Sequence, residues 1–299
     1  MPRKKLSLAK IWFVFLFALI VNVKASAATE QAMLRVMSYN IRLDTPADGL
    51  NDWSHRHDML TSQIYWLRPD IFGLQEVVTN QKRDIAEALR SDFALVGVGR
   101  DDGKDAGESS PIGYNIHRFK LLKSGTFWLS PTPDIPSKGW DAAYPRVATW
   151  IRLREMKTGK TILAINTHWD HIGVEARKQS ALQLKQWLAD HRKPKDHVIL
   201  MGDLNAEPDS APLGILTDMK SPVWLRSAAV NATFRPFGPK GTFNDFKLQP
   251  ENQRTIDHIL VGGQKGGEIW ISRYAVIAQN VDGRMISDHY PVLADLMLK

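Results

Sequence analysis

Short apolar runs separated by polar residues recur along most of the chain, and this pattern is typical of β-strands. In the last run, Val292, Ala294 and Leu296 alternate with Leu293 and Asp295, as expected for a strand with two distinct faces. The sequence predicts strands at Leu34–Asn40, Ile71–Gln75, Phe93–Val98, Phe119–Leu129, Arg146–Leu153, Thr161–Thr167, His197–Gly202, Thr255–Val261, Ile269–Ile277 and Pro291–Leu298.

Helical periodicity is less frequent. The first helical pattern follows a capping residue, Asn51 or Asp52, places Leu60 and Ile64 on one face, and stops before Pro69. The predicted helices are Trp53–Leu67, Gln81–Leu89 and Glu175–His191. Many strands and few helices without a Pro/Gly/Ser-rich linker predict one α+β domain over residues 28–299, with packed sheets and helices outside them. The strand order does not follow from this pattern.

Polar residues collect where the predicted strands end. The residues at these positions carry carboxylate, amide or imidazole groups: Asn40, Glu76, His168, Asp203, Asn205, Asp257, Asp288 and His289. Taken alone, each is better explained as a turn residue, a helix cap or a buried structural histidine. Six such strand ends together predict a cleft at one rim of the sheets.

The chemistry of this set favours phosphate-ester hydrolysis. Carboxylate and amide oxygens suit a hard cation such as Mg²⁺ or Mn²⁺. Histidines with acidic neighbours suit proton transfer and the stabilisation of negative charge. No G-x-S-x-G, P-loop or G-x-G-x-x-G motif is present, which disfavours a serine hydrolase and nucleotide-cofactor folds. The absence of cysteine excludes disulfides, Cys-ligated metal sites and a Cys nucleophile.

The N-terminal segment has the order of a secretory signal peptide. Basic residues, an apolar run and a small-residue motif follow one another: Arg3, Lys4, Lys5 and Lys10, then Ile11–Val23, then Ala25-Ser26-Ala27. The apolar run of 13 residues is shorter than the roughly 20 that span a bilayer. We expect residues 1–27 to be cleaved and the protein to be periplasmic or secreted, without a stable membrane span. The alternative is an uncleaved N-terminal anchor.

Removal of this segment changes the charge. The chain has 39 basic and 32 acidic residues, a net charge of +7, but residues 1–27 hold five of the basic residues and none of the acidic ones. The remainder has 34 basic and 32 acidic residues, a net charge of +2. Bulk charge therefore gives little reason to prefer long nucleic acid over a small phosphate ester.

Six motifs occur in the order of a known superfamily. They are Met37-Ser38-Tyr39-Asn40-Ile41-Arg42, Leu74-Gln75-Glu76, Asn166-Thr167-His168, Gly202-Asp203-Leu204-Asn205, Ile256-Asp257-His258 and Ser287-Asp288-His289. Together they resemble the signatures of the endonuclease/exonuclease/phosphatase superfamily, which includes deoxyribonuclease I, and their style is closest to secreted bacterial and deadenylase-like members. The resemblance implies a four-layer αββα sandwich of two mixed β-sheets flanked by helices.

The resemblance also implies roles on the metal side of the site. Glu76 would be the main ligand of Mg²⁺ or Mn²⁺, with Asn40 beside it and Asp288 near the ion. Asp203 would position or deprotonate the attacking water, and Asn205 would hold the phosphate.

Two histidines would contact the phosphate. By the same resemblance, His289 would stabilise the developing charge while Asp257 orients it, and His168 would contact the phosphate from the other side. Glu108 is a candidate partner of His168; the alternative is a solvated loop charge.

The residues expected to bind the rest of the substrate are Arg42, Arg146, His171, Trp169 and Trp140. Arg146 is a candidate bidentate clamp for the phosphate; as an alternative, it is a surface charge. Trp140 and Trp169 are candidates for stacking on a base or a sugar, although most tryptophans in such a chain belong to the core.

The sequence therefore predicts an exported, metal-dependent phosphoesterase that works by in-line attack of water. A phosphodiesterase or nuclease is favoured, and a phosphomonoesterase acting on a sugar or lipid-headgroup phosphate is the alternative. A non-catalytic protein that binds a phosphate ligand is the alternative of another class. The expected partner is a phosphate ester, nucleic acid included; we expect a monomer with no obligate protein partner.

Overall fold

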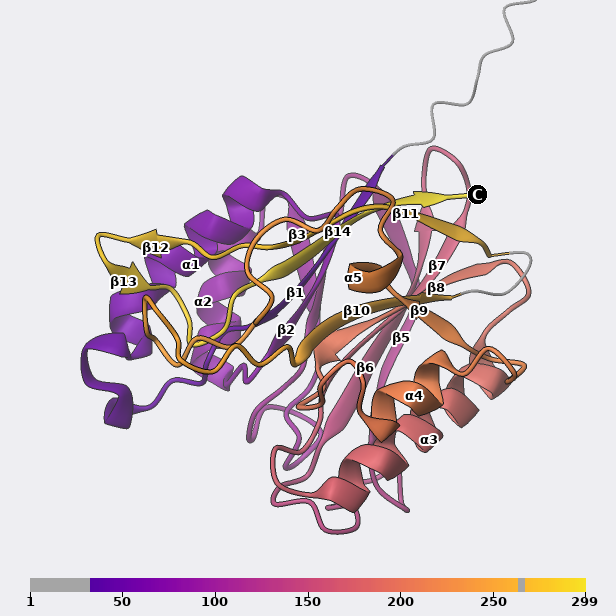
Figure 1. Ribbon diagram of the computed structural model, residues 1–299, viewed down its shortest axis with the longest axis horizontal. Helices are drawn as coiled ribbons and strands as arrows, with labels where there is room; N and C mark the ends of the chain where they lie inside the picture. The colour runs from indigo at the N-terminus through magenta and orange to yellow at the C-terminus, as the bar shows by residue number, and fades with distance from the viewer. Residues whose placement is uncertain (1–32, 263–266) are drawn as a thin grey trace, which may run out of the picture. The chain divides into compact units, whose positions relative to one another are not determined.

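The computed structural model describes residues 33–262 and 267–299, and the expected signal peptide lies outside these residues. Two six-stranded sheets form the centre of the described body (Figure 1). In sheet order, the first contains β11 (Ile269–Val276), β14 (Val292–Leu298), β1 (Leu34–Asn40), β2 (Ile71–Gln75), β4 (Ile112–Asn115) and β3 (Phe93–Val96). The second contains β5 (Phe119–Trp128), β6 (Val147–Glu155), β7 (Thr161–His168), β8 (Asp196–Asp203), β10 (Asp257–Gly262) and β9 (Leu225–Ser227).

Both sheets are mixed. β1 pairs with β2 in parallel and with β14 antiparallel, and β7 pairs with β8 in parallel while the remaining pairs of the second sheet are antiparallel. A separate hairpin joins β12 (Asn280–Val281) to β13 (Arg284–Met285).

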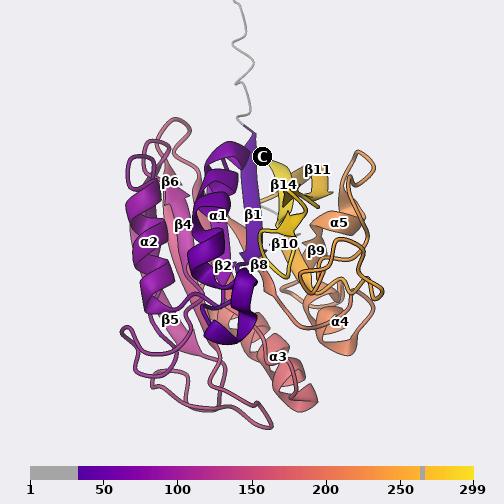
Figure 2. The ribbon, with the colours of Figure 1, turned by 90° about the vertical axis from the view of Figure 1, so that its left-hand side faces the viewer.

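Helices cover the outer face of each sheet (Figure 2). α1 (Trp53–Leu67) and α2 (Thr79–Leu89) pack on the first sheet, and α3 (Val174–His191) and α4 (Ala211–Thr217) pack on the second. A 3₁₀ helix, η1 (Pro46–Asn51), precedes α1, and the short α5 (Ala228–Asn231) follows β9. The four-layer α+β sandwich is therefore confirmed. Within the described ranges no helix is long and apolar enough to cross a membrane.

The central core lies between the two sheets. Alternate residues of β14, such as Val292 and Ala294, face the second sheet, whereas Leu293 joins the cluster beneath α1 and α2. This is the two-faced strand that the alternation predicts. Asp52 caps α1 by accepting a hydrogen bond from the backbone N–H of His55, as expected from the sequence.

A buried amide network joins the two sheets below the rim. Gln75 Nε2 donates to Asn166 Oδ1 at 2.7 Å, and Asn166 Nδ2 donates to the backbone oxygens of Leu74 and Pro111 at 2.8 and 2.9 Å. Gly73 leaves the space for this side chain, because a Cβ there would lie 2.4 Å from Asn166 Oδ1. The sheets are therefore held in register next to the strand ends that carry the polar residues.

We expect Gly73→Ala to destabilise the fold by about 1–3 kcal/mol, because the added methyl displaces the Asn166 amide from its partners. Urea unfolding would measure the change. Gly214→Ala is the matched control, since no atom lies within 4 Å of a Cβ at that position in α4. The control should be neutral or slightly stabilising, and equal stability of the two variants would contradict the role of Gly73.

Candidate active site

The polar strand ends converge on one cleft of about 680 Å³. β7 and β8 place His168 opposite Asp203, and Asp257 at the start of β10 lies opposite Asp203 on its other side. Asn40 lies opposite Gln75 at the ends of β1 and β2 in the first sheet. The two sheets therefore each contribute one side of the cleft.

Five residues that line the cleft have left-handed backbone, among them Glu76 and Asn205 of the predicted site. Glu76 (φ 62°) directly follows β2 and Asn205 (φ 45°) lies just beyond β8. Such a conformation costs on the order of 1 kcal/mol for a residue other than glycine. The left-handed conformation turns the backbone away from the direction of the strand, and both side chains then line the cleft.

Asp203 is the central acceptor of the site. Its carboxylate is buried, and Oδ2 accepts a hydrogen bond from Asn40 Nδ2 at 3.0 Å. The Nε2 atoms of His168 and His289 lie 3.5 and 3.8 Å from the same oxygen. Burial, followed by the charge of Asp257, raises the pKa of Asp203 to about 7. A carboxylate with this pKa can accept a proton near neutral pH.

His289 is held as a cation by Asp257. His289 Nδ1 lies 2.8 Å from Asp257 Oδ2, and both side chains are buried. Burial alone would lower the pKa of His289, but the charge and hydrogen bond of Asp257 and the nearby carboxylates of Asp203 and Asp288 raise it to about 10. Its Nε2 is thereby directed into the cleft as a donor for an anionic group.

We expect Asp257→Asn to lower kcat on the order of 10²-fold and to move the alkaline limb of the pH profile to lower pH, because His289 loses the charge that keeps it protonated. The raised pKa of His289 stabilises the fold fully below pH 6.5, and this contribution disappears as the pH rises through about 10. Urea unfolding at both ends of this range would test the second effect. An unchanged alkaline limb would contradict the pairing.

His168 differs from His289 because cations surround it. Burial, followed by the positive charges of Arg146 and Arg100, lowers the pKa of His168 well below its usual value. Asn205 Nδ2 lies 3.1 Å from His168 Nε2. Glu108 Oε2 lies 3.8 Å from His168 Nδ1, while Glu108 Oε1 pairs with Arg100 at 2.8 Å. Glu108 therefore stands beside His168, as predicted, but its short contact is with Arg100.

The predicted metal ligands gather on the first-sheet side of the cleft. Glu76 accepts hydrogen bonds from Asn40 Nδ2 at 3.0 Å and the backbone N–H of Leu43 at 3.1 Å. Burial and the charge of Glu76 raise the pKa of Asp288, to about 6, although His289 opposes the shift. Two carboxylates that repel one another in a buried site fit a divalent cation, which would remove this repulsion.

A second acidic group is less suited to a metal ion. Asp203, Asp257 and His289 offer buried ligand atoms within 4.8 Å of one another. However, His289 donates a 2.8 Å hydrogen bond to Asp257 and has a raised pKa, so its ring is protonated. A protonated imidazole has no free lone pair and cannot bind a metal ion. Glu76 and Asp288 are therefore the better ligand pair, with Asn40 holding Glu76 in place.

Three of the residues expected to bind substrate line the cleft: Arg42, Arg146 and His171. Arg146 is buried, donates to Asp170 Oδ2 at 3.2 Å and lies 3.0 Å from His171 Nδ1, so the alternative of a surface charge is wrong. Arg42 is held by two hydrogen bonds to Asp48 at 2.8 and 2.9 Å.

The two tryptophans lie elsewhere. Trp169 is fully buried in the core between the second sheet and α3 and α4, so the expectation that it stacks on substrate is wrong. It follows His168 directly at the end of β7, where neighbouring side chains point to opposite faces of the sheet. Trp140 is half-buried and is not among the cleft-lining residues.

Several residues in or beside the cleft had no predicted role. The carboxylate of Asp170 accepts hydrogen bonds from the backbone N–H groups of Ile172 and Gly173 and from the side chain of Arg146. Arg100 and Tyr144 form the rim, with the guanidinium carbon 4.8 Å from the ring centroid. Asp170 could have been found from the sequence, because it lies only two residues after the predicted site residue His168. Arg100 and Tyr144 could not, because contacts between distant loops produce no recognisable sequence pattern.

Comparison with known proteins shows similarity in sequence and in fold. The model of the endonuclease/exonuclease/phosphatase family matches residues 37–289. A structure of such a protein from Bacteroides vulgatus is 36% identical, with a TM-score of 0.83 over 90% of this chain and 100% of that one. A mannosyl-6-phosphatase from Bacteroides thetaiotaomicron is 34% identical, with a TM-score of 0.81 over 88% and 99%. A probable RNA exonuclease from Saccharomyces cerevisiae is 26% identical over 64% of this chain and 41% of its own length.

Proposed function

Because the chain belongs to the endonuclease/exonuclease/phosphatase family, whose members hydrolyse phosphate esters, we propose that it is an exported, Mg²⁺- or Mn²⁺-dependent phosphomonoesterase acting on a small sugar phosphate. The observation that supports hydrolytic activity is the arrangement around Asp203, in which an acceptor with a pKa of about 7 lies within 4 Å of a neutral and of a cationic histidine. Such a set serves turnover, since mere binding of phosphate needs no proton acceptor.

In the proposed mechanism, the substrate phosphate lies between His168 and His289. Asp203 orients the attacking water and accepts its proton as the water oxygen bonds to phosphorus. The bond from phosphorus to the sugar oxygen breaks, and the sugar leaves as an alcohol after its oxygen takes a proton from solvent. His289 Nε2 and Asn205 Nδ2 donate to the non-bridging oxygens, on which charge accumulates in the transition state. A divalent cation held by Glu76 and Asp288 would offset further negative charge on the phosphate.

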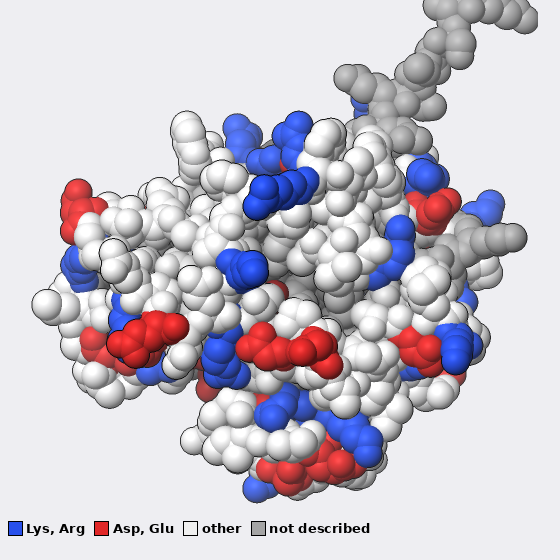
Figure 3. Space-filling model, in the orientation of Figure 1, with Lys and Arg blue, Asp and Glu red and all other residues white. Residues whose placement is uncertain are grey.

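The preference for a monoester differs from the sequence-based preference for a phosphodiester. A monoester carries more negative charge than a diester at neutral pH, and two buried arginines, Arg100 and Arg146, border the cleft in addition to His289. The similarity to a mannosyl-6-phosphatase over nearly the full length of both proteins supports the same preference. On the face shown in Figure 3, Lys and Arg are interspersed with Asp and Glu rather than forming a continuous basic track.

A phosphodiesterase acting on nucleic acid is the second candidate, favoured by the similarity to a probable RNA exonuclease. A panel of sugar 6-phosphates, p-nitrophenyl phosphate, bis-p-nitrophenyl phosphate, RNA, DNA and phospholipids, each with Mg²⁺ or EDTA, distinguishes the candidates. Turnover of the diesters alone would replace the monoesterase by the second candidate. Metal-independent binding with no turnover of any substrate would identify a non-catalytic phosphate-binding protein.

Export rests on the sequence of residues 1–27. Mass spectrometry of the protein recovered from its host should give an N-terminus close to residue 28. Intact Met1 on the soluble protein would overturn cleavage.

A further inference from the structure

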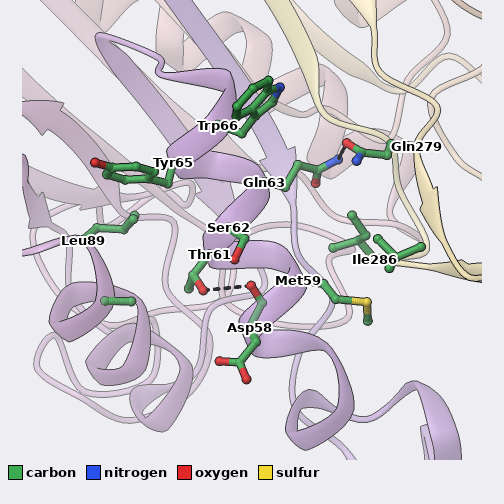
Figure 4. Close-up of a pocket in the computed structure, with 12 residues that line it drawn as sticks. Asp58, Met59, Thr61, Ser62, Gln63, Tyr65, Trp66, Leu89, Gln279 and Ile286 are labelled. Atoms are coloured by element: carbon green, nitrogen blue, oxygen red, sulfur yellow. Dashed lines mark hydrogen bonds between the residues drawn. The ribbon is translucent and has the colours of Figure 1, made fainter.

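Besides Tyr65, whose ring contacts Arg68, three large aromatic side chains stand exposed near the C-terminal end of α1. Trp66 is 83% exposed, Phe237 is 73% exposed and Phe234 is 56% exposed. Figure 4 shows Trp66 projecting from α1 above Gln63, whose amide donates to Gln279 at 3.2 Å. Single exposed apolar residues are ordinary, but three aromatic rings of this size in one region need an explanation.

The two phenylalanines are held in position by backbone pairing. The N–H of Phe234 donates to the oxygen of Ser272 at 3.1 Å, and the N–H of Phe237 donates to that of Tyr274 at 3.0 Å. Phe237 also accepts a hydrogen bond from the N–H of Val276 at 2.9 Å. The segment therefore extends the edge of β11, and both rings are presented by fixed backbone.

Two hollows are lined by neighbouring residues of the same two segments. One of about 690 Å³ is lined by Trp66 and Gln279, and the other, of about 270 Å³, by Leu67, Phe237 and Ile277. Trp66 and Leu67 are consecutive in the last turn of α1. The three aromatic rings therefore belong to one region of the surface.

Arginines surround the rings. Arg35, Arg235 and Arg273 line the smaller hollow, and the guanidinium carbon of Arg273 lies 5.9 Å from the centroid of Phe234. Arg35 pairs with Asp295 at 2.8 Å, whereas Arg235 and Arg273 make no ion pair with any residue in 33–262 or 267–299. Figure 3 shows Lys and Arg gathered along the upper margin of the face, above the place of β14 in Figure 1.

We propose that this aromatic–basic surface, formed by Trp66, Phe234, Phe237, Arg35, Arg235 and Arg273, docks on an anionic lipid bilayer. Trp and Phe rings enter the boundary between headgroups and acyl chains, and arginines pair with lipid phosphates. Arg235 and Arg273, which have no carboxylate partner among the described residues, complement an acidic membrane. They disfavour a second copy of the same surface, which would bring like charges together.

The docked protein would keep its active site open. Arg35 lies near the start of β1 and Asn40 at its end, a separation of roughly 17 Å along the strand. α1 likewise begins near the cleft, where Arg56 binds the backbone oxygen of Ile41, and ends beside Arg35, which donates to the oxygen of Leu67. The surface therefore anchors the protein without covering the cleft, and turnover of a soluble substrate should not depend on it.

Vesicle flotation tests this proposal. The full chain, as its host produces it, should float with vesicles of phosphatidylcholine mixed with phosphatidylglycerol and only weakly with phosphatidylcholine alone, and added salt should release it. Because each cation near an acidic surface contributes about fivefold to binding, Arg235→Glu with Arg273→Glu should lower the partition coefficient by at least about 25-fold. Trp66→Ser with Phe234→Ser and Phe237→Ser should also abolish flotation.

Matched controls lie on other surfaces. Lys193→Glu with Lys195→Glu makes the same charge change, and Met219→Ser with Val230→Ser removes exposed apolar groups next to a different hollow. All variants are prepared with the same N-terminus as the wild type. They should unfold at the wild-type temperature and hydrolyse a soluble substrate at the wild-type rate.

Three results would overturn the proposal. The first is failure of the wild type to float with acidic vesicles, and the second is flotation that the surface variants leave unchanged. The third is a surface-dependent dimer or a surface-dependent complex with single-stranded oligonucleotide in place of vesicle binding; light scattering and fluorescence anisotropy would detect these.

Discussion

Asp203→Asn should lower kcat by about 10³-fold while leaving the protein folded. The amide has the size of the carboxylate and can still meet the Nδ2 of Asn40 after rotation, but it cannot accept the proton of the attacking water. Loss of this proton acceptor and of the negative charge between His168 and His289 acts on the transition state, so KM should change much less than kcat.

The matched control for this variant is Asp190→Asn, which makes the same chemical change on the exposed side of α3. Its kcat should equal that of the wild type. Because Asp203 is buried with a raised pKa, its replacement should not destabilise the protein. A kcat within tenfold of the wild type would assign proton transfer to another group.

Chelation should abolish turnover, and Glu76→Gln should raise the Mg²⁺ concentration needed for half-maximal activity by roughly 10²-fold or more. Replacing a residue that merely supports a metal ligand costs 10- to 100-fold in affinity, and a ligand should lie at or beyond the upper end of that range. Glutamine keeps the hydrogen bond from the Leu43 N–H but removes half of the carboxylate pair with Asp288.

Titration of activity with Mg²⁺ and Mn²⁺ separates this effect from a structural one. A variant that has only lost its metal affinity regains activity at high cation concentration, whereas a misfolded variant does not. Glu87→Gln on α2 is the control, because its carboxylate is exposed and pairs only with Arg90 among the described residues. Full activity of the wild type in EDTA would contradict a metal-dependent reaction.

The convergence of the polar residues on one cleft could be predicted because each of them adjoins the end of an apolar run. Once the runs become strands, residues such as His168 and Asp203 must reach the rim, and the parallel pairing of β7 with β8 places them side by side. The short β4 and β9 were missed, since four and three residues show no usable alternation. The hairpin of β12 and β13 was missed for the same reason.

The substrate side of the cleft was harder to predict because it depends on contacts between distant loops. Arg146 is fixed by Asp170 and His171, and Tyr144 by Arg100, none of which belongs to a periodic pattern. Trp169 shows the opposite case. The alternation that puts His168 in the cleft also puts its neighbour in the core, so the strand pattern already argued against a stacking role.

The pairing of β1 with β14 fixes the order in which the protein acquires its site. Leu34 lies opposite Leu296, so the first sheet stays open between β1 and β11 until nearly the whole sequence has been synthesised. Asp288 and His289, which both line the cleft, come just before β14. A growing polypeptide therefore cannot assemble the complete cleft until the strand that closes the first sheet has followed these two residues.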